Sequence, residues 1–202
     1  MHLTTDDFAG LESLYRRHFM NTLPGPRGVH LIGTLGYKGT PNLGVFNSVV
    51  HISASPPHLG FILRPLTVPR HTYHHLKAQG YFTVNTIHRA MLPAAHQTSA
   101  NYPLEESEFE AVGLTPQYAD RHPAPYVKES RVKIGLAFVE EHRIGVNDTR
   151  LIIGRVEEII IDEAAVAPSG HVDHQALGTL GVMGLDTYFD VQDPTPLPYA
   201  RP

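Results

Sequence analysis

The sequence predicts a mainly β protein, built from antiparallel strands with flanking helices in a single domain. The apolar runs are short and rich in β-branched and aromatic residues, and turns containing some of the 17 glycines and 17 prolines separate them. Short strands joined in this way indicate an antiparallel meander rather than βαβ units with a parallel sheet. No linker divides the 202 residues, a length that suits one compact domain.

The first third of the chain is expected to hold one helix and three strands. An amphipathic helix is predicted over Thr4–Met20, because Asp6 and Asp7 favour a helix N-terminus and apolar residues recur at helical spacing after them. The proline-containing stretch Leu23–Gly28 ends any helix. The three predicted strands that follow, each bounded by Gly or Pro turns, are Val29–Leu35, Leu43–Ser53 and Leu59–Leu63.

A helix is predicted over Pro69–Gln79, because Pro69 suits the first helical position and Gly80 suits the residue just past the end. The later elements are a strand (Tyr81–Ile87), a short helix near Glu105–Val112, a proline-containing loop (Ala119–Val127) and a hairpin of two long strands (Ser130–Arg143 and Arg150–Ile161). Residues 1–22 therefore form an N-terminal helical segment, and the proline-rich residues 191–202 an extended tail.

Composition and charge exclude several classes of function. The chain has no cysteine, so thiolate nucleophiles, disulfides and sulfur-ligated metals are ruled out. A formal net charge of −4 gives no reason to expect binding to nucleic acid or to an anionic membrane. Neither a secretory signal nor a run of roughly 20 apolar residues is present, so a cytoplasmic location is expected. No P-loop and no G-x-S-x-G elbow occur, and the spacing in Gly33–Gly39 does not fit a dinucleotide fingerprint.

One segment combines a strand end, a loop and a Pro-initiated helix with several hydrogen-bond donors. Arg64 ends the strand, and Thr67, Arg70 and Thr72 surround the first turn of the helix. The first N–H groups of a helix have no internal partners and carry partial positive charge, so this spot suits a phosphate group. The alternative is a capped helix whose arginines are solvated.

Two further polar clusters are candidates for ligand contacts. Asn47 and Ser48 interrupt an apolar strand and offer hydrogen-bonding groups to a heteroaromatic ring lying along it; an edge or bulge in the strand is the alternative. The small or polar residues His96–Ser99 favour either a ligand loop or an ordinary loop. His71 and His75 are one helical turn apart, a spacing that suits a metal, but no third ligand is evident and surface histidines are the preferred interpretation.

Taken in order, these segments resemble the flavin reductase-like, FMN-binding split-barrel family, which includes flavoredoxin. The resemblance runs from about Leu23 to Tyr188 and rests on an ordered set of stretches rather than on one motif. These stretches are Pro24–Thr34, Pro41–Ser48, Ser53–Pro57 with the strand after it, Arg70–Thr72, Gly80–Asn85 and Glu108–Leu114. A subgroup of the family carries a His-Gln-Thr-Ser sequence, which is present here as residues 96–99.

The resemblance implies a six-stranded antiparallel split β-barrel over residues 23–190, usually a homodimer with FMN near the interface. Carried over by position, Asn47, Ser48 and Val49 would face the isoalloxazine and ribityl chain. The residues implied around the phosphate are Arg64, Thr67, Arg70, His71 and Thr72, and those implied to close over the flavin are His96, Gln97, Thr98 and Ser99. Arg70 stands where many relatives have Lys, which keeps the cation. Tyr188 ends a segment that in the family lies near the ligand.

The implied activity is an NAD(P)H-dependent flavin oxidoreductase that transfers hydride to FMN. The nicotinamide would stack on the flavin, so no Rossmann fingerprint is required, and no acid–base residue of the protein is obligatory. One alternative is a non-catalytic FMN-binding electron carrier like flavoredoxin. Another is a barrel without flavin that holds haem or a different ligand through its histidines.

Overall fold

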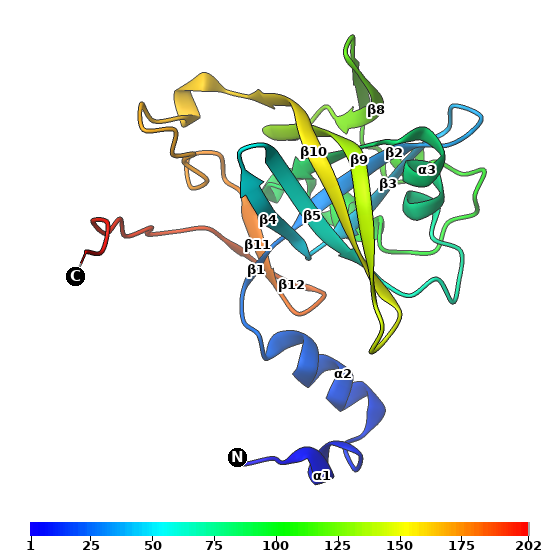
Figure 1. Ribbon diagram of the computed structural model, residues 1–202, viewed down its shortest axis with the longest axis vertical. Helices are drawn as coiled ribbons and strands as arrows, with labels where there is room; N and C mark the ends of the chain where they lie inside the picture. The colour runs from blue at the N-terminus through cyan, green and yellow to red at the C-terminus, as the bar shows by residue number, and fades with distance from the viewer. Residues whose placement is uncertain (202) are drawn as a thin grey trace.

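The computed structural model describes residues 1–201 and consists of a curled antiparallel sheet with short helices around it (Figure 1). Seven strands form the main sheet, and every neighbouring pair is antiparallel. Their order across the sheet is β3 (Pro41–Phe46), β2 (His30–Leu35), β6 (Tyr81–Thr86), β9 (Val132–Ile144), β10 (Thr149–Ile161), β5 (Pro57–Leu63) and β4 (Val49–Ala54). The predicted fold class is thereby confirmed, including the long hairpin of β9 and β10.

The two edges of this sheet are consecutive in sequence. β3 pairs with β2 at one edge, β4 pairs with β5 at the other, and only Asn47 and Ser48 lie between them. The prediction of one continuous strand over Leu43–Ser53 is therefore wrong, because the chain changes partners at this point, which we call the β3–β4 junction. If β3 and β4 are counted as one interrupted strand, the barrel has the six strands that were expected. The barrel is split between β3 and β4, which are the two edges of the sheet.

Two apolar clusters hold the barrel together. Inside it, Phe61 packs edge-to-face against Phe46 and Phe82, with ring centroids 5.1 Å and 5.5 Å apart. Gly154 packs against the Phe82 ring, because a Cβ added at this glycine would be 2.6 Å from Phe82 Cζ. The second cluster packs the outer elements onto the sheet and is formed by buried residues including Val29, Leu31, Leu43, Phe109 and Leu180.

The segment expected to be a loop, Ala119–Val127, is mostly a strand. β7 (Pro116–Ala119) and β8 (His122–Val127) form a hairpin of their own, outside the main sheet. The prolines do not prevent this, because Pro123 and Pro125 fall where the register shifts and are not among the paired residues. A proline lacks an N–H and is tolerated where the ladder requires no donor.

The N-terminal segment is two short helices rather than the single predicted one. α1 (Thr5–Phe8) ends before Gly10, and α2 (Ser13–Thr22) restarts where the Glu12 carboxylate accepts hydrogen bonds from the backbone N–H groups of Leu14 and Tyr15. Neither helix contains a buried residue, and both stand away from the barrel (Figure 1). No helix within residues 1–201 is long and apolar enough to cross a membrane.

The remaining elements lie outside the main sheet. α3 (His71–Gln79) begins two residues later than predicted and ends as expected before Gly80, whose φ of 78° suits glycine. A small three-stranded sheet consists of β1 (Arg27–Gly28), β11 (Leu180–Met183) and β12 (Thr187–Asp190). The helices are α3 (His71–Gln79), α4 (Leu92–Gln97) and α5 (Glu108–Val112), with 3-10 turns η1 (Arg89–Met91) and η2 (Glu163–Ala165). Residues 191–201 form neither helix nor strand.

Candidate functional site

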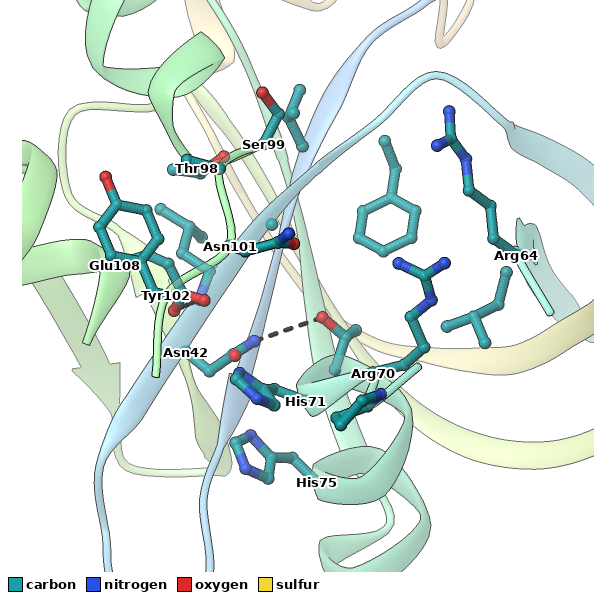
Figure 2. A pocket seen from close by; sticks show the side chains of 18 of the residues that line it. Asn42, Arg64, Arg70, His71, His75, Thr98, Ser99, Asn101, Tyr102 and Glu108 are labelled. Atoms are coloured by element: carbon teal, nitrogen blue, oxygen red, sulfur yellow. Dashed lines mark hydrogen bonds between the residues drawn. The ribbon is translucent and has the colours of Figure 1, made fainter. Parts of the chain in front are cut away.

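A cavity of about 1500 Å³ opens where the β3–β4 junction, α3, α4 and the β11–β12 turn meet. Its lining comes from residues 29–48, 62–78, 96–108 and 182–188. At one end lies the β3–β4 junction, and at the other the N-terminus of α3. The loop between α4 and α5 forms the opposite wall, as Figure 2 shows with Thr98, Ser99 and Tyr102 facing Arg70 and His71.

The α3 end of the cavity carries unneutralised positive charge. Arg70 is the residue before α3, and its side chain gives the helix no cap within the described chain. The Arg70 and Arg64 side chains lie on the same side of the cavity (Figure 2), and neither forms a salt bridge with any residue of 1–201. Partial burial, and then the charge of Arg64, lowers the pKa of Arg70 from its usual value. Two cations and free helix amides thus face one region of the cavity, an arrangement suited to a phosphate.

Behind this charged end lies a buried hydrogen-bond network that fixes Thr72. The amide nitrogen of Asn42 donates to the hydroxyl oxygens of Thr34, at 3.0 Å, and Thr72, at 3.3 Å. Figure 2 shows the second of these bonds at the floor of the cavity. Because the Thr72 oxygen accepts from Asn42, its own O–H remains available to a ligand. The network also orders β2, β3 and α3 relative to one another.

At the β3–β4 junction, the polar side chains bond to the protein itself. The Asn47 side-chain amide donates to the carbonyl of Gly184 at 2.8 Å, and so ties the β11–β12 turn to the barrel. The Ser48 hydroxyl donates to the carbonyl of Ile62 at 2.9 Å and accepts from the N–H of the same residue at 3.2 Å. Ser48 thereby replaces a backbone pair that the strand break removes. Both residues line the cavity, and their side chains are held by the protein itself.

The wall formed by α4 and β12 contains a histidine–tyrosine pair. His96 Nδ1 lies 2.8 Å from the hydroxyl of Tyr188, and the two rings meet edge-to-face with centroids 5.6 Å apart. Burial, and then the charge of Asp186, raises the pKa of Tyr188, so the phenol keeps its proton at neutral pH. Gln97 points elsewhere and donates to the hydroxyl of Tyr102 at 3.2 Å. The pair joins two elements that are distant in sequence and positions both side chains on the cavity.

A buried carboxyl lies opposite α3. Glu108 begins α5, and its carboxylate accepts a hydrogen bond from the Leu43 N–H at 3.0 Å. Burial raises the pKa of Glu108, although the Leu43 hydrogen bond and the nearby His71 oppose this shift. The rings of His71 and His75 lie nearly parallel on α3, with centroids 6.3 Å apart. No group of three or more metal-ligating side chains was found within residues 1–201.

Most of the residues singled out from the sequence line this one cavity. They are Asn47, Ser48, Arg64, Arg70, His71, Thr72, His96, Thr98 and Ser99. Three do not: Val49 packs against the barrel core, Thr67 lies in an exposed loop, and Gln97 points to Tyr102. Sequence reasoning missed Asn42, Asn101 and Tyr102, which also line the cavity. Asn42, a polar residue inside an otherwise apolar strand, carried the same signal that drew attention to Asn47.

Comparison with known proteins agrees with this geometry. Residues 22–177 match the family model described as "Flavin reductase like domain". A crystal structure of a candidate flavin reductase with a split barrel domain from Shewanella frigidimarina is 41% identical, with a TM-score of 0.95, and the match covers 99% of this chain and 100% of that one. The protein therefore belongs to the flavin reductase-like family, and this places it in the class of flavin-binding oxidoreductases.

More distant relatives extend the likeness of fold. Flavoredoxin of Desulfovibrio vulgaris has a TM-score of 0.75 at 23% identity, over 87% of this chain and 92% of that one. An uncharacterised protein of Halalkalibacterium halodurans is 28% identical over 128 residues, which are 61% of this chain. The matched region also spans 61% of that relative's length.

Proposed function

We propose that the protein binds FMN in this cavity and uses NADPH or NADH to reduce flavin. The observation that carries the proposal is the placement of Arg64 and Arg70 at the uncapped start of α3, in the same cavity as the β3–β4 junction. This combination provides a phosphate site at one end and a backbone-lined wall for a flat ring at the other. The Shewanella relative, at 41% identity over nearly the whole chain, supports flavin reduction as the activity.

The residues present fit FMN. Arg64, Arg70, the Thr72 hydroxyl and the first α3 amides would hold the phosphate, which carries the only charge of the group. The junction residues Asn47 and Ser48, with their side chains occupied, would present backbone groups to the ring. When bound, FMN supplies the ring that accepts a hydride and passes the electrons on.

The part played by the chain is binding, orientation and exclusion of water. His96, Tyr188 and the turn held by Asn47 form the wall facing the junction, so they would limit how a nicotinamide and a flavin stack. No side chain is assigned to proton transfer, since hydride transfer between the two rings requires none.

We also propose a cytoplasmic homodimer. Val50 and Ile52 on the edge strand β4 are 45% and 40% exposed, and an uncovered apolar edge is a site for pairing with another chain. Light scattering of the purified protein would give its mass in solution, and a monomeric mass at micromolar concentration would contradict the proposal.

The first test is to release and identify the flavin of the purified protein, and then to follow NADPH and NADH oxidation with added FMN. Bound FMN with rapid oxidation of either donor is expected. Bound FMN without donor oxidation would instead favour an electron carrier that receives its electrons from another protein. A preparation that neither contains nor binds flavin would contradict the whole proposal.

A further inference from the structure

The helices α1 and α2 form an N-terminal arm that projects from the barrel (Figure 1). One side of α2 is apolar: the rings of Tyr15 and Phe19 stack with centroids 5.8 Å apart, and Leu14 flanks them. Ser13 and Arg17 lie on the opposite side of the helix. Neither helix contains a buried residue, and Leu14 and Tyr15 are 49% and 45% exposed. A helix of ten residues is marginal by itself in water, so this one needs cover on its apolar side.

The arm is nevertheless fixed in direction. At its base, the Arg27 guanidinium donates to the carbonyl of Asn21 at 2.6 Å and to that of Gly184 at 3.4 Å. Further out, the guanidinium of Arg16 donates to the Phe8 carbonyl at 3.2 Å and joins α1 to α2. These bonds hold α1 and α2 as one unit that leaves the barrel at the β11–β12 turn. The apolar side of α2 is therefore presented to a neighbour rather than folded back on its own chain.

A relative has the same arm in the same place. The matched part of the flavin reductase-like family model begins at residue 22, so the arm lies outside it. The Shewanella structure, in contrast, superposes on 99% of this chain, which includes the arm. The arm thus keeps its direction relative to the barrel in two chains that are 41% identical, although the barrel of this chain buries none of its residues. A contact with another molecule accounts for this constancy.

The barrel carries an apolar face that suits the arm. Val50 and Ile52 lie on the edge strand β4 and belong to neither of the two clusters that hold the barrel together. Val50 pairs with Gly60, and a Cβ added at Gly60 would lie 3.2 Å from both Ile52 Cδ1 and Leu151 Cδ1. The side chains of Ile52 and Leu151 therefore meet over this glycine on the outer side of the sheet. We call Val50, Ile52, Gly60 and Leu151 the β4 face.

We propose that the apolar side of α2 packs on the β4 face of a second copy of this chain, so that two copies exchange arms. A two-fold dimer uses each contact twice, and every copy has one uncovered arm and one uncovered face. The β4 face also lies at the edge strand that favours pairing with another chain. The inference rests on the proposed homodimer and adds which segments hold it together.

The experiment measures the dimer dissociation constant of full-length protein by analytical ultracentrifugation. The arm variant combines Tyr15→Ser with Phe19→Ser, and the face variant combines Val50→Ser with Ile52→Ser. We expect each to weaken the dimer by about a hundredfold or more, because every lost contact occurs twice. Far-UV circular dichroism checks that both variants stay folded, and the arm variant changes no buried residue.

Two matched controls make the same kind of change elsewhere. Arg17→Ser places serine on the opposite side of α2, and Ile159→Ser removes an exposed apolar side chain from β10 beyond its pairing with β5. Both controls should leave the dimer dissociation constant unchanged. An equal loss in the controls would mean that helix propensity or general surface polarity, not the arm contact, sets dimer strength, and would overturn the proposal.

Mixing the two variants tests whether arm and face are partners. In a heterodimer, the intact arm of the face variant meets the intact face of the arm variant, so one of the two contacts is kept, whereas each homodimer keeps none. With one variant labelled by a fluorophore, we expect heterodimers at concentrations where each variant alone is monomeric. Loss of the dimer in both variants without rescue on mixing would overturn the exchange.

The other outcomes separate this inference from the proposals on which it rests. A monomeric wild type would overturn both the homodimer and the exchange of arms. A dimeric wild type whose arm variant dimerises equally well would overturn the exchange alone. Binding to anionic lipid vesicles that the arm variant loses, at an unchanged dimer dissociation constant, would assign the arm to a membrane surface instead. Flavin binding is measured separately, so its failure would leave the result on the arm intact.

Discussion

At the β3–β4 junction polar side chains are satisfied by the protein, whereas at the α3 end two arginines face the cavity without an acidic partner among residues 1–201. The side chains of Asn47 and Ser48 donate hydrogen bonds to the backbone carbonyls of Gly184 and Ile62, respectively. Arg64 and Arg70 form no salt bridge with the residues described. The junction therefore contributes shape, and the α3 end contributes charge. Substitutions at the junction should change stability first, and substitutions at the α3 end should change ligand affinity first.

The largest effect that we expect is a loss of unfolding free energy at low pH, caused by a histidine at the junction end. His30 lies opposite Phe46 in the β2–β3 ladder, and part of the residue reaches the surface, but its Nδ1 is buried without a partner in residues 1–201. Burial, and then the neighbouring His174, lowers its pKa from 6.5 to about 4. As the pH falls through this window the unfolded chain takes up the proton first, so the folded state loses stability, on the order of 3 kcal/mol.

The check is the unfolding free energy from denaturant titrations at pH 7.5, 5.5 and 4. His30→Gln should reduce the loss at low pH, because glutamine does not titrate. His51→Gln, at an exposed position on β4, should leave the change of unfolding free energy with pH as in the wild type. An unchanged slope in the His30 variant would show that other groups dominate the acid sensitivity.

The next largest effect concerns charge at the α3 end. Arg70→Ala should weaken FMN by roughly 1.5–3 kcal/mol, because a charge-assisted contact to phosphate is lost. Riboflavin, which has no phosphate, should bind the variant almost as it binds the wild type. Flavin fluorescence titrations give both constants, and Lys128→Ala is the control. Equal losses for the two flavins would place the phosphate elsewhere.

At the junction, we expect a loss of stability and an equal weakening of FMN and riboflavin, in contrast to the FMN-specific loss at the α3 end. Ser48→Ala leaves the Ile62 N–H and carbonyl without the hydroxyl that bonds to both, at a cost of about 1–2 kcal/mol of unfolding free energy. FMN and riboflavin should weaken together, since only the shape of the site changes. Ser55→Ala removes an exposed hydroxyl from the turn between β4 and β5 and serves as control. A loss confined to FMN would mean that the two ends do not have separate roles.

The two ends also differ in how far the sequence reveals them. The α3 end is local: Arg64, Pro69, Arg70 and Gly80 lie within one short stretch, and cap preferences with clustered donors predict a phosphate site there, which stays a prediction. The junction depends on distant partners. Asn47 bonds to Gly184, 137 residues away, and nothing in the neighbourhood of Asn47 indicates that contact.

The errors in the predicted fold have a similar cause. Strand propensity runs through Leu43–Ser53 apart from Asn47 and Ser48, and the break arises because the chain must pass from β2 to β5 as its neighbour. In β8, the prolines suggested a loop because local rules cannot show that the ladder shifts register where they fall. Antiparallel order and the long hairpin were predictable, because each rests on adjacent segments of sequence.

The smallest effect is expected at the α4–β12 wall, where His96 and Tyr188 meet across 92 residues of sequence. Tyr188→Phe keeps the ring packed against the core and removes one hydrogen bond, so unfolding free energy should fall by about 0.5–1.5 kcal/mol. Tyr102→Phe, which removes the bond to Gln97, is the matched control on the facing loop. A double-mutant cycle with His96→Ala measures the coupling directly.

If the pair only shapes the junction end, its loss should shift FMN and riboflavin affinity equally. A change in NADPH oxidation at unchanged flavin affinity would instead assign the pair to the encounter with the donor.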